Sequence, residues 1–365
     1  MKKLEKTVVV FLVLVLVALN CVLFAVFFVF SQDEVKRFLN YTEETTETEM
    51  AVNLPESEKN ELIIDSYKGE FQVYQNDKLI NTFFDYKEAV EYASKYENAS
   101  VKRYNGNFWL WDNTPQYNVY LDGGDNFKAF NTFADAVSFA KQNKYADVYY
   151  RKNNQFVWNN HEPISGKIIS YVPHINQLPE LKRGCEVTSL AMLLNYKGIK
   201  VDKMTLATEI KKDTTPYNVI NGKIYFGNPN NGFVGNIFDY SSKGLGVYHL
   251  PIYGLLSSYA GNNALDLTGC EFEDLYYFIN KNCPIWIITN TKYDELPQSS
   301  FETWITPDGE VTVTYNEHSV LVVGYDDSYV YINDPLASAG YIKKEKTRFI
   351  KAWKQMGRQA VTIRK

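Results

Sequence analysis

Cysteine is scarce in this sequence: 365 residues contain only four, and just Cys185, Cys270 and Cys283 follow the apolar N-terminal run. Disulfide-stabilised domains carry denser, even-numbered cysteines, so the core must stabilise this chain. Cys270 and Cys283 are separated by a predicted helix, which puts them about 15–20 Å apart, whereas a disulfide needs Cα atoms within about 7 Å. We expect both to be buried thiols rather than a disulfide.

Histidine is equally rare, with four residues, and no pair shows His-x-x-x-His spacing; Cys-x-x-Cys is also absent. A zinc mechanism therefore has no support in the sequence. The chain has no Gly-x-x-x-x-Gly-Lys motif, so we expect no ATPase activity. The net charge of −5 gives no basic face for a nucleic acid. We expect no cofactor, no metal and no nucleic-acid partner.

One long apolar run is present, the 23 residues from Val8 to Phe30. This length is sufficient to span a bilayer. Three lysines precede the run, and the positive-inside rule then places the rest of the chain outside the cytoplasm. We expect residues 1–31 to be a cytoplasmic tip and an uncleaved transmembrane signal anchor of a single-pass cell-membrane protein. The alternative is secretion after signal cleavage.

Residues 32–66 are acidic and poor in large apolar side chains, which predicts a flexible linker. An internal repeat follows. The helix start Asp85-x-x-Glu88 returns at an offset of 47 as Thr132-x-x-Asp135, and a matching apolar stripe follows each. Hairpin patterns flank both helices. We therefore predict two small ββαββ repeats, at 67–113 and 114–162.

Aromatic side chains recur in both repeats, among them Trp109, Trp111, Phe156 and Trp158. Aromatic residues are favoured in strands, so the first interpretation is a small core. An exposed stacking surface for a glycan or an extended peptide is the alternative. The sequence leaves both open.

The run from Asn176 to Gly198 places Cys185 at the start of a predicted helix, because apolar residues follow it at helical spacing and Gly198 ends the pattern. A thiol there meets unpaired backbone N–H groups and the positive end of the helix dipole, which favour the thiolate. Gln177 lies eight positions earlier. Its side-chain amide can donate a hydrogen bond to a developing oxyanion.

The segment 317–334 alternates as two strands around a polar turn, which predicts a hairpin. With a three-residue loop, Tyr325 faces Tyr329, and His318 and Asp334 lie on one face of the sheet. A two-residue loop would reverse this parity. In the first register the histidine can take a proton from a thiol, while the carboxylate holds the histidine tautomer.

The region 163–365 predicts one mixed α+β unit. Its remaining elements are a helix at 203–211 capped by Asp202, a long Gly- and Asn-rich loop at 227–254, a helix at 273–281, a buried strand at 284–289, irregular and strand-like segments at 299–315 and a closing strand at 360–363.

Three segments carry a family resemblance: YVPHINQLPELKRGCEVTSLAMLLNYKGI, NPNNGFVGN and EHSVLVVGYDDSYVYINDPL. They resemble the C-thirty-nine-like family of papain-like cysteine peptidases, relatives of the bacteriocin-leader peptidases. The resemblance implies a helix carrying cysteine packed on an antiparallel sheet carrying histidine and aspartate. It implies Cys185 as nucleophile, His318 as base, Asp334 as its orienting group and Gln177 as oxyanion donor.

The sequence departs from the leader peptidases proper. They carry Asp-Cys-Gly and are fused to a transporter, whereas this chain has Gly184-Cys185-Glu186 and no transporter follows. We do not expect double-glycine leaders as substrates.

The expected function is that of a membrane-anchored, extracytoplasmic cysteine peptidase. Its partners would be a peptide or protein substrate, the membrane through the N-terminal helix, and a cell-wall or protein partner through the repeats. Two alternatives stay open: a thiol amidase or acyl transferase acting on wall peptides, and a non-catalytic surface binding protein that uses the aromatic repeats.

Overall fold

The computed structural model describes residues 70–104, 109–151 and 154–364. All of them lie in one compact part of the chain, Ile63–Lys365. The predicted membrane span and acidic linker lie outside the described residues. Within the described ranges, no helix combines the length and apolar character needed to cross a bilayer.

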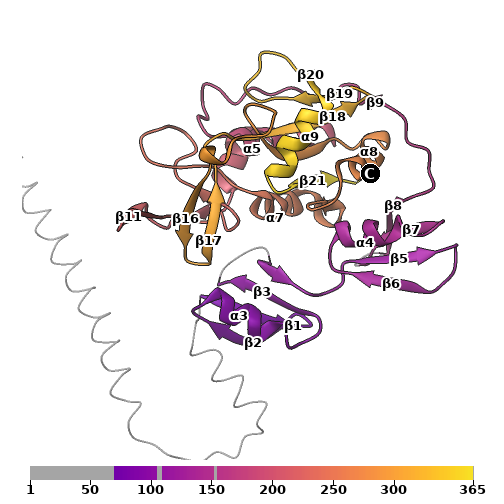
Figure 1. The fold of residues 1–365 in the computed structure, drawn as a ribbon, viewed down its shortest axis with the longest axis horizontal. Helices are drawn as coiled ribbons and strands as arrows, with labels where there is room; N and C mark the ends of the chain where they lie inside the picture. Colours follow the sequence, from indigo (N-terminus) through magenta and orange to yellow (C-terminus); the bar gives the residue numbers. More distant parts are fainter. Residues whose placement is uncertain (1–69, 105–108, 152–153, 365) are drawn as a thin grey trace, which may run out of the picture. The chain divides into compact units, whose positions relative to one another are not determined.

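The first described unit is a four-stranded sheet, in the order β2-β1-β3-β4, with one helix packed on it (Figure 1). Val73 of β1 pairs with Val101 of β3, and both are fully buried. The helix begins where the Asp85 side chain accepts a hydrogen bond from the Glu88 backbone N–H at 2.9 Å, as the capping pattern predicts. The elements are β1 (Phe71–Gln75), β2 (Lys78–Phe83), α3 (Tyr86–Ala93), β3 (Ala99–Arg103) and β4 (Trp111–Asp112).

The second unit has the same construction, with strand order β6-β5-β7-β8. Val119 pairs with Val148, the counterparts of the buried valine pair of the first unit. Thr132 caps the helix by accepting from the Asp135 N–H at 3.1 Å. The elements are β5 (Tyr117–Leu121), β6 (Phe127–Phe130), α4 (Phe133–Ala140), β7 (Ala146–Tyr150) and β8 (Gln155–Asn159).

The aromatic residues of the two units lie in different environments. Trp158 is buried and its ring lies 6.1 Å from that of Tyr277, as a core interpretation predicts. Trp109 is only half-buried and packs edge-on against Tyr74 at 5.3 Å, with the Lys102 ammonium 4.7 Å from the Tyr74 ring. The first unit therefore keeps an aromatic pair near its surface.

The second unit shares its hydrophobic core with the C-terminal part of the chain, whereas the first unit has a core of its own. The Phe133 ring lies 5.5 Å from that of Phe278, both nearly fully buried. The Lys141 ammonium lies 2.8 Å from the Asp274 carboxylate. Residues 114–162 thus stabilise the C-terminal part by burying its apolar surface.

We expect a chain that begins at residue 163 to melt about 10 °C below one that begins at residue 114. Each large side chain that loses its buried partner costs about 1.5–3 kcal/mol, and 1 kcal/mol corresponds to about 2–4 °C in a domain of this size. Differential scanning calorimetry of both chains and the full chain provides the measurement. Loss of residues 70–113 should change the melting temperature of the rest by only a few degrees. Equal melting temperatures of the chains that begin at residues 114 and 163 would contradict the shared core.

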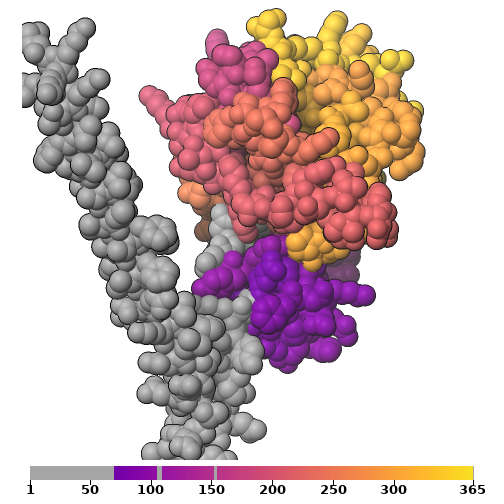
Figure 2. Space-filling model, turned by 90° about the vertical axis from the view of Figure 1, so that its left-hand side faces the viewer, coloured from indigo at the N-terminus to yellow at the C-terminus, as the bar shows by residue number. Residues whose placement is uncertain are grey.

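The C-terminal part is built on a seven-stranded sheet in the order β14-β21-β15-β18-β19-β20, with β9 paired to β18. Every strand pairing in it is antiparallel. Figure 2 shows the C-terminal segment, in yellow, beside the orange and red segments from the middle of the chain on one continuous surface. The strands are β9 (Lys167–Ile168), β14 (Ala264–Asp266), β15 (Ile285–Asn290), β18 (Glu317–Tyr325), β19 (Tyr329–Asn333), β20 (Ile342–Glu345) and β21 (Ala360–Ile363).

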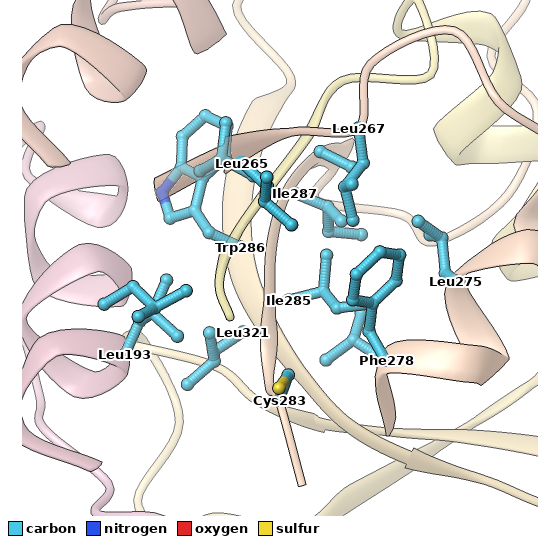
Figure 3. Close-up of a cluster of buried hydrophobic side chains, with 14 of the residues drawn as sticks. Leu193, Leu265, Leu267, Leu275, Phe278, Cys283, Ile285, Trp286, Ile287 and Leu321 are labelled. Atoms are coloured by element: carbon cyan, nitrogen blue, oxygen red, sulfur yellow. The ribbon is translucent and has the colours of Figure 1, made fainter. Parts of the chain in front are cut away.

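All residues of β15 and β18 are buried, because helices cover both faces of the sheet. Figure 3 shows Leu193 and Phe278 approaching β15 from opposite sides, with Trp286 on the Leu193 side of the strand and Ile285 beside Phe278. The Trp286 indole N–H donates to the Glu186 carbonyl at 2.9 Å and ties the sheet to the helix. The helices are α5 (Cys185–Tyr196), α6 (Lys203–Glu209), α7 (His249–Ala260), α8 (Phe272–Asn280) and α9 (Lys346–Gln355).

Two smaller sheets complete the structure: a parallel pair, β10-β13, and a four-stranded sheet in the order β11-β12-β16-β17. The segment predicted as irregular and strand-like is a regular hairpin, β16 and β17. The strands are β10 (Lys212–Asp213), β11 (Asn218–Ile220), β12 (Lys223–Tyr225), β13 (Phe233–Val234), β16 (Glu302–Thr306) and β17 (Gly309–Val313).

The predictions for α6, α8, β15 and β21 are confirmed within one or two residues, and Cys270 and Cys283 are buried free thiols as expected. The prediction of one long loop at 227–254 is wrong in part, because it contains β13 and the first turns of α7. The buried side of α7 includes Pro251 and Gly254. Proline and glycine usually mark turns, so a helix was not predicted here from the sequence.

The predicted hairpin at 317–334 exists, but its turn register differs. Tyr325 pairs with Val330, not with Tyr329. A β-bulge between Val322 and Gly324 then shifts the pairing by one residue. Beyond the bulge, the strands follow the register that puts His318 and Asp334 on one face, so the incorrect turn and the bulge compensate each other.

Candidate active site

Cys185 is the first residue of α5, with Gly184 at the N-cap position. A Cβ on Gly184 would lie 2.4 Å from the Leu181 Cβ, so the close approach of this loop requires glycine. The cysteine is 7% exposed and lines a cleft of about 780 Å³ together with Gln177 and His318. The structure therefore brings the predicted nucleophile, base and amide to one cleft.

His318 lies in β18 and is 2% exposed. Its Nε2 is 2.8 Å from Asp334 Oδ1. Because this contact fixes the proton on Nε2, Nδ1 is the nitrogen that can accept a proton from the cleft. The geometry is that of a histidine oriented by a carboxylate.

Asp334 is held by more than the histidine. Its Oδ2 accepts a hydrogen bond from the Tyr293 hydroxyl at 2.5 Å, and its Oδ1 also accepts from the Leu336 N–H at 2.9 Å. Burial opposes ionisation of this carboxyl, but the hydrogen bonds of His318 and Tyr293 and the attraction to His318 outweigh it and lower the pKa of Asp334 to about 2. The carboxylate remains charged throughout the neutral range.

Tyr293 was not predicted from the sequence. It lies just beyond β15 with φ of +53°, a backbone conformation that is unusual for a tyrosine. Burial, followed by the charge of Asp334, raises the pKa of its hydroxyl, which therefore stays a donor. No motif marks such a residue, because its contact with Asp334 spans 41 positions of the chain.

The depressed pKa of Asp334 predicts that it stabilises the fold above its unfolded pKa of about 3.9, and that this contribution disappears as the pH falls through about 2. After allowance for partial solvent screening, we expect about 1–2 kcal/mol. In urea unfolding between pH 2 and 7, Asp334→Asn should therefore show a shallower acid decline than the original chain. Parallel pH curves for the two chains would contradict the charged pairing.

Gln177 is 2% exposed and lies at the cleft, but its amide is engaged elsewhere. Nε2 donates to the carbonyls of Leu181 and Lys182 at 3.2 and 3.4 Å. Among the described residues, Oε1 has no hydrogen-bond partner. The backbone N–H of Gln177 donates to the Pro335 carbonyl at 2.8 Å, which fixes this segment next to Asp334.

The thiol of Cys185 does not meet the expectation of a thiolate. Its Sγ donates to Glu186 Oε2 at 3.3 Å, and no hydrogen bond joins it to His318 in the described part of the chain. Burial, and then the carboxyls of Glu186 and Glu317, raise the pKa of the Cys185 thiol well above its usual range. Cys185 lies at the helix N-terminus as predicted, but burial and two acidic neighbours favour the protonated thiol.

Three basic residues line the cleft: Lys182, Arg183 and Lys243. The Arg183 guanidinium donates to backbone carbonyls of the 236–242 loop. These contacts order the loop that forms one wall of the cleft. Across the described ranges, Cys185, Glu186 and Glu317 are the one group of three side chains close enough together to share a metal ion.

Comparison with known proteins identifies the family of this chain. Residues 169–361 match the Peptidase_C39 like family. The uncharacterized protein YvpB of Bacillus subtilis is 49% identical over 187 residues, which cover 51% of this chain and 71% of YvpB. The crystal structure of a candidate C39-like peptidase from Bacillus anthracis is similar with a TM-score of 0.52 and 50% identity, covering 55% of this chain and 98% of that one. The match spans more than half of the sequence, and the chain therefore belongs to the Peptidase_C39 like family.

Proposed function

We propose that the chain is a cysteine peptidase that hydrolyses peptide bonds through Cys185, His318 and Asp334. The observation that carries the proposal is the 2.8 Å contact between His318 Nε2 and Asp334 Oδ1 at a cleft that Cys185 also lines. Membership of the Peptidase_C39 like family supports the reaction class.

The reaction begins when the Cys185 thiol turns from Glu186 toward His318 and transfers its proton to Nδ1. The thiolate then attacks the carbonyl carbon of the substrate. The protonated His318 gives its proton to the leaving amine, and a thioester on Cys185 remains. His318 next takes a proton from water, whose oxygen attacks the thioester, so the acid product leaves and the thiol is restored.

The oxyanion of each tetrahedral intermediate accepts hydrogen bonds from the backbone N–H of Cys185 and from the Gln177 amide. The first donor lies at the free N-terminus of α5, where N–H groups lack partners within the helix. For the second, one amide hydrogen must leave the carbonyls of Leu181 and Lys182 and turn into the cleft. Gln177→Ala should reduce turnover about 10²-fold, measured as kcat with a cleaved peptide, with little change in KM. An unchanged kcat would remove Gln177 from the mechanism.

The test of the function is digestion of a peptide library by the full chain, with products identified by mass spectrometry. The expected result is new amino termini that require Cys185 and are absent with Cys185→Ala. Adding an external amine distinguishes hydrolysis from acyl transfer, since a transferase would attach the amine to the acyl product. No cleavage and no transfer across the library would favour the binding-protein alternative.

We further propose that the enzyme is anchored by the apolar segment Val8–Phe30 and acts outside the cytoplasm, with the repeats holding it near a wall or protein partner. The support is the length of the segment and the lysines before it. Exposure of intact cells to an added protease tests this directly. Digestion of the C-terminal part in intact cells is expected, whereas protection until lysis would overturn the orientation.

A further inference from the structure

Two buried glutamates flank Cys185, and the proposed reaction uses neither. Glu186 follows the cysteine on α5 and is fully buried, and Glu317 begins β18 and is 9% exposed. Glu186 accepts hydrogen bonds from the Cys185 thiol and from the Val247 N–H, at 3.3 and 2.7 Å. Glu317 Oε1 is buried and has no hydrogen-bond partner among the described residues. Glu317 therefore brings a buried carboxyl with an unsatisfied oxygen to this cluster.

Two carboxyls in such a place need positive charge nearby, because a buried charge is costly unless it is paired or bound to a metal. Neither glutamate forms an ion pair with any described residue. Arg183, on the wall of the same cleft, directs its guanidinium to backbone carbonyls, and Lys243 lies over the Tyr217 ring at 5.8 Å. The negative charge of the two carboxyls must therefore be neutralised by bound protons or by a bound cation.

The three side chains form a set of ligands that a cation can use. One ligand atom each from Cys185, Glu186 and Glu317 lies within 4.8 Å of the other two. Zn²⁺ accepts thiolate at about 2.3 Å and carboxylate oxygen at about 2.0–2.2 Å, in tetrahedral sites that can keep one position for water. Because Cys185 and Glu317 line the cleft, the ion can enter from it and hold water on that side.

Gly246 leaves the space that the two carboxylates occupy. A Cβ at this position would lie 2.0 Å from Glu186 Oε1 and 3.1 Å from Glu317 Oε2. The Glu186 oxygen fills the volume that any other residue would take. Glycine at position 246 therefore leaves room for both carboxyls beside the thiol.

We propose that Cys185, Glu186 and Glu317 form a binding site for Zn²⁺ or a similar thiophilic divalent cation, and that occupation of the site blocks the nucleophile. The Cys185 thiol proton, and any proton held by the glutamates, is released to water when the metal binds, and no redox change occurs. His318 is outside the ligand set, because neither of its ring nitrogens belongs to the group of atoms that lie within 4.8 Å of one another. The binding step stands by itself, and the blocking step rests on the proposed function.

Binding is measured with the metal-free full chain by competition for Zn²⁺ with a chromophoric chelator. Replacement of Zn²⁺ by Co²⁺ adds a thiolate-to-metal charge-transfer band that reports the Cys185 ligand. One Zn²⁺ per chain and this band are expected. Cys185→Ala should abolish the band, and Glu317→Gln should weaken Zn²⁺ binding roughly 100-fold.

Matched variants distinguish this site from metal binding elsewhere on the chain. His318→Ala and Cys283→Ala should keep both Zn²⁺ binding and the Co²⁺ band, because they lie outside the ligand set. Absence of binding in the original chain, or binding that survives in Glu317→Gln, would overturn the inference, as would loss of binding in His318→Ala. Glu317→Gln is used in preference to Glu186→Gln because Glu186 also holds the Val247 backbone, and circular dichroism confirms that each variant folds.

The two proposals fail in different ways. Zn²⁺ binding without peptide cleavage under metal-free conditions would sustain the site and end the proposed function. Cleavage without Zn²⁺ binding would sustain the function and end this inference. If both hold, micromolar Zn²⁺ should inhibit cleavage by the original chain and inhibit Glu317→Gln about 100-fold less effectively.

Discussion

Replacement of Cys185 by alanine should reduce peptide hydrolysis by about 10⁵-fold, to the level of the reaction in water plus the remaining oxyanion stabilisation. The reason is that the thioester intermediate cannot form without the sulfur. The measurement is kcat/KM with a peptide identified from the library digest. Cys185 is buried, so loss of the sulfur leaves a small cavity, and circular dichroism of the variant checks that the fold is retained.

Cys270→Ala and Cys283→Ala are the matched controls, because both residues are buried free thiols in the same part of the chain. Each should retain activity within a few-fold. Comparable losses in all three variants would mean that the sulfur acts through packing, and they would contradict a nucleophilic role for Cys185.

His318→Ala should reduce kcat by roughly 10⁴ to 10⁶, because the residue takes the thiol proton and later protonates the leaving group. Asp334→Asn should cost less, about 10³-fold, since the histidine remains but loses the partner that fixes its tautomer. Both values come from the same assay with the same peptide.

Tyr293→Phe tests whether the hydrogen bond from the Tyr293 hydroxyl helps to hold Asp334 in place. Its hydroxyl is the second side chain that donates to the carboxylate, so its loss should weaken the hold on Asp334 and reduce kcat about 10-fold while KM stays constant. A change in KM alone would assign Tyr293 to substrate binding.

Activity equal in Asp334→Asn and in the original chain would contradict the orienting role of the carboxylate.

The elements that carry the candidate site could be predicted because each has a strong local pattern. The apolar spacing after Cys185 defines α5, and the alternation around the turn defines the hairpin of His318 and Asp334. The precise pairing could not be predicted, because a bulge inside β18 depends on packing from both faces and leaves no mark in a period-two pattern. Helix α9, Lys346–Gln355, was also missed, although Glu345 caps it by accepting from two backbone N–H groups.

The contacts that shift the pKa values at the site could not be predicted from the sequence, because they join segments that are far apart in the chain. Tyr293 reaches Asp334 across the sheet, and Glu317 meets Glu186 only because β18 packs beside α5. The sequence predicted a thiol activated by the helix N-terminus. Burial and the two carboxyls instead raise the pKa of the Cys185 thiol, which favours the protonated form.

This structure therefore describes a resting state in the proposed mechanism. The thiol donates to Glu186, and His318 is already oriented by Asp334. In the proposed mechanism, the Cys185 side chain must turn from Glu186 toward His318 Nδ1. A substrate that fills the cleft, or the removal of a bound cation, would favour that step.

Covalent labelling by peptide-based electrophiles tests the central claim most directly, because these probes react with a thiol that a histidine can deprotonate. The full chain, free of metal, is treated with a panel of peptidyl acyloxymethyl ketones and analysed by intact mass and peptide mapping. One adduct is expected, located on Cys185, and no adduct is expected in His318→Ala. Equal labelling of Cys185 in both chains, or none in the original chain while Cys270 or Cys283 is labelled, would contradict a cysteine–histidine pair.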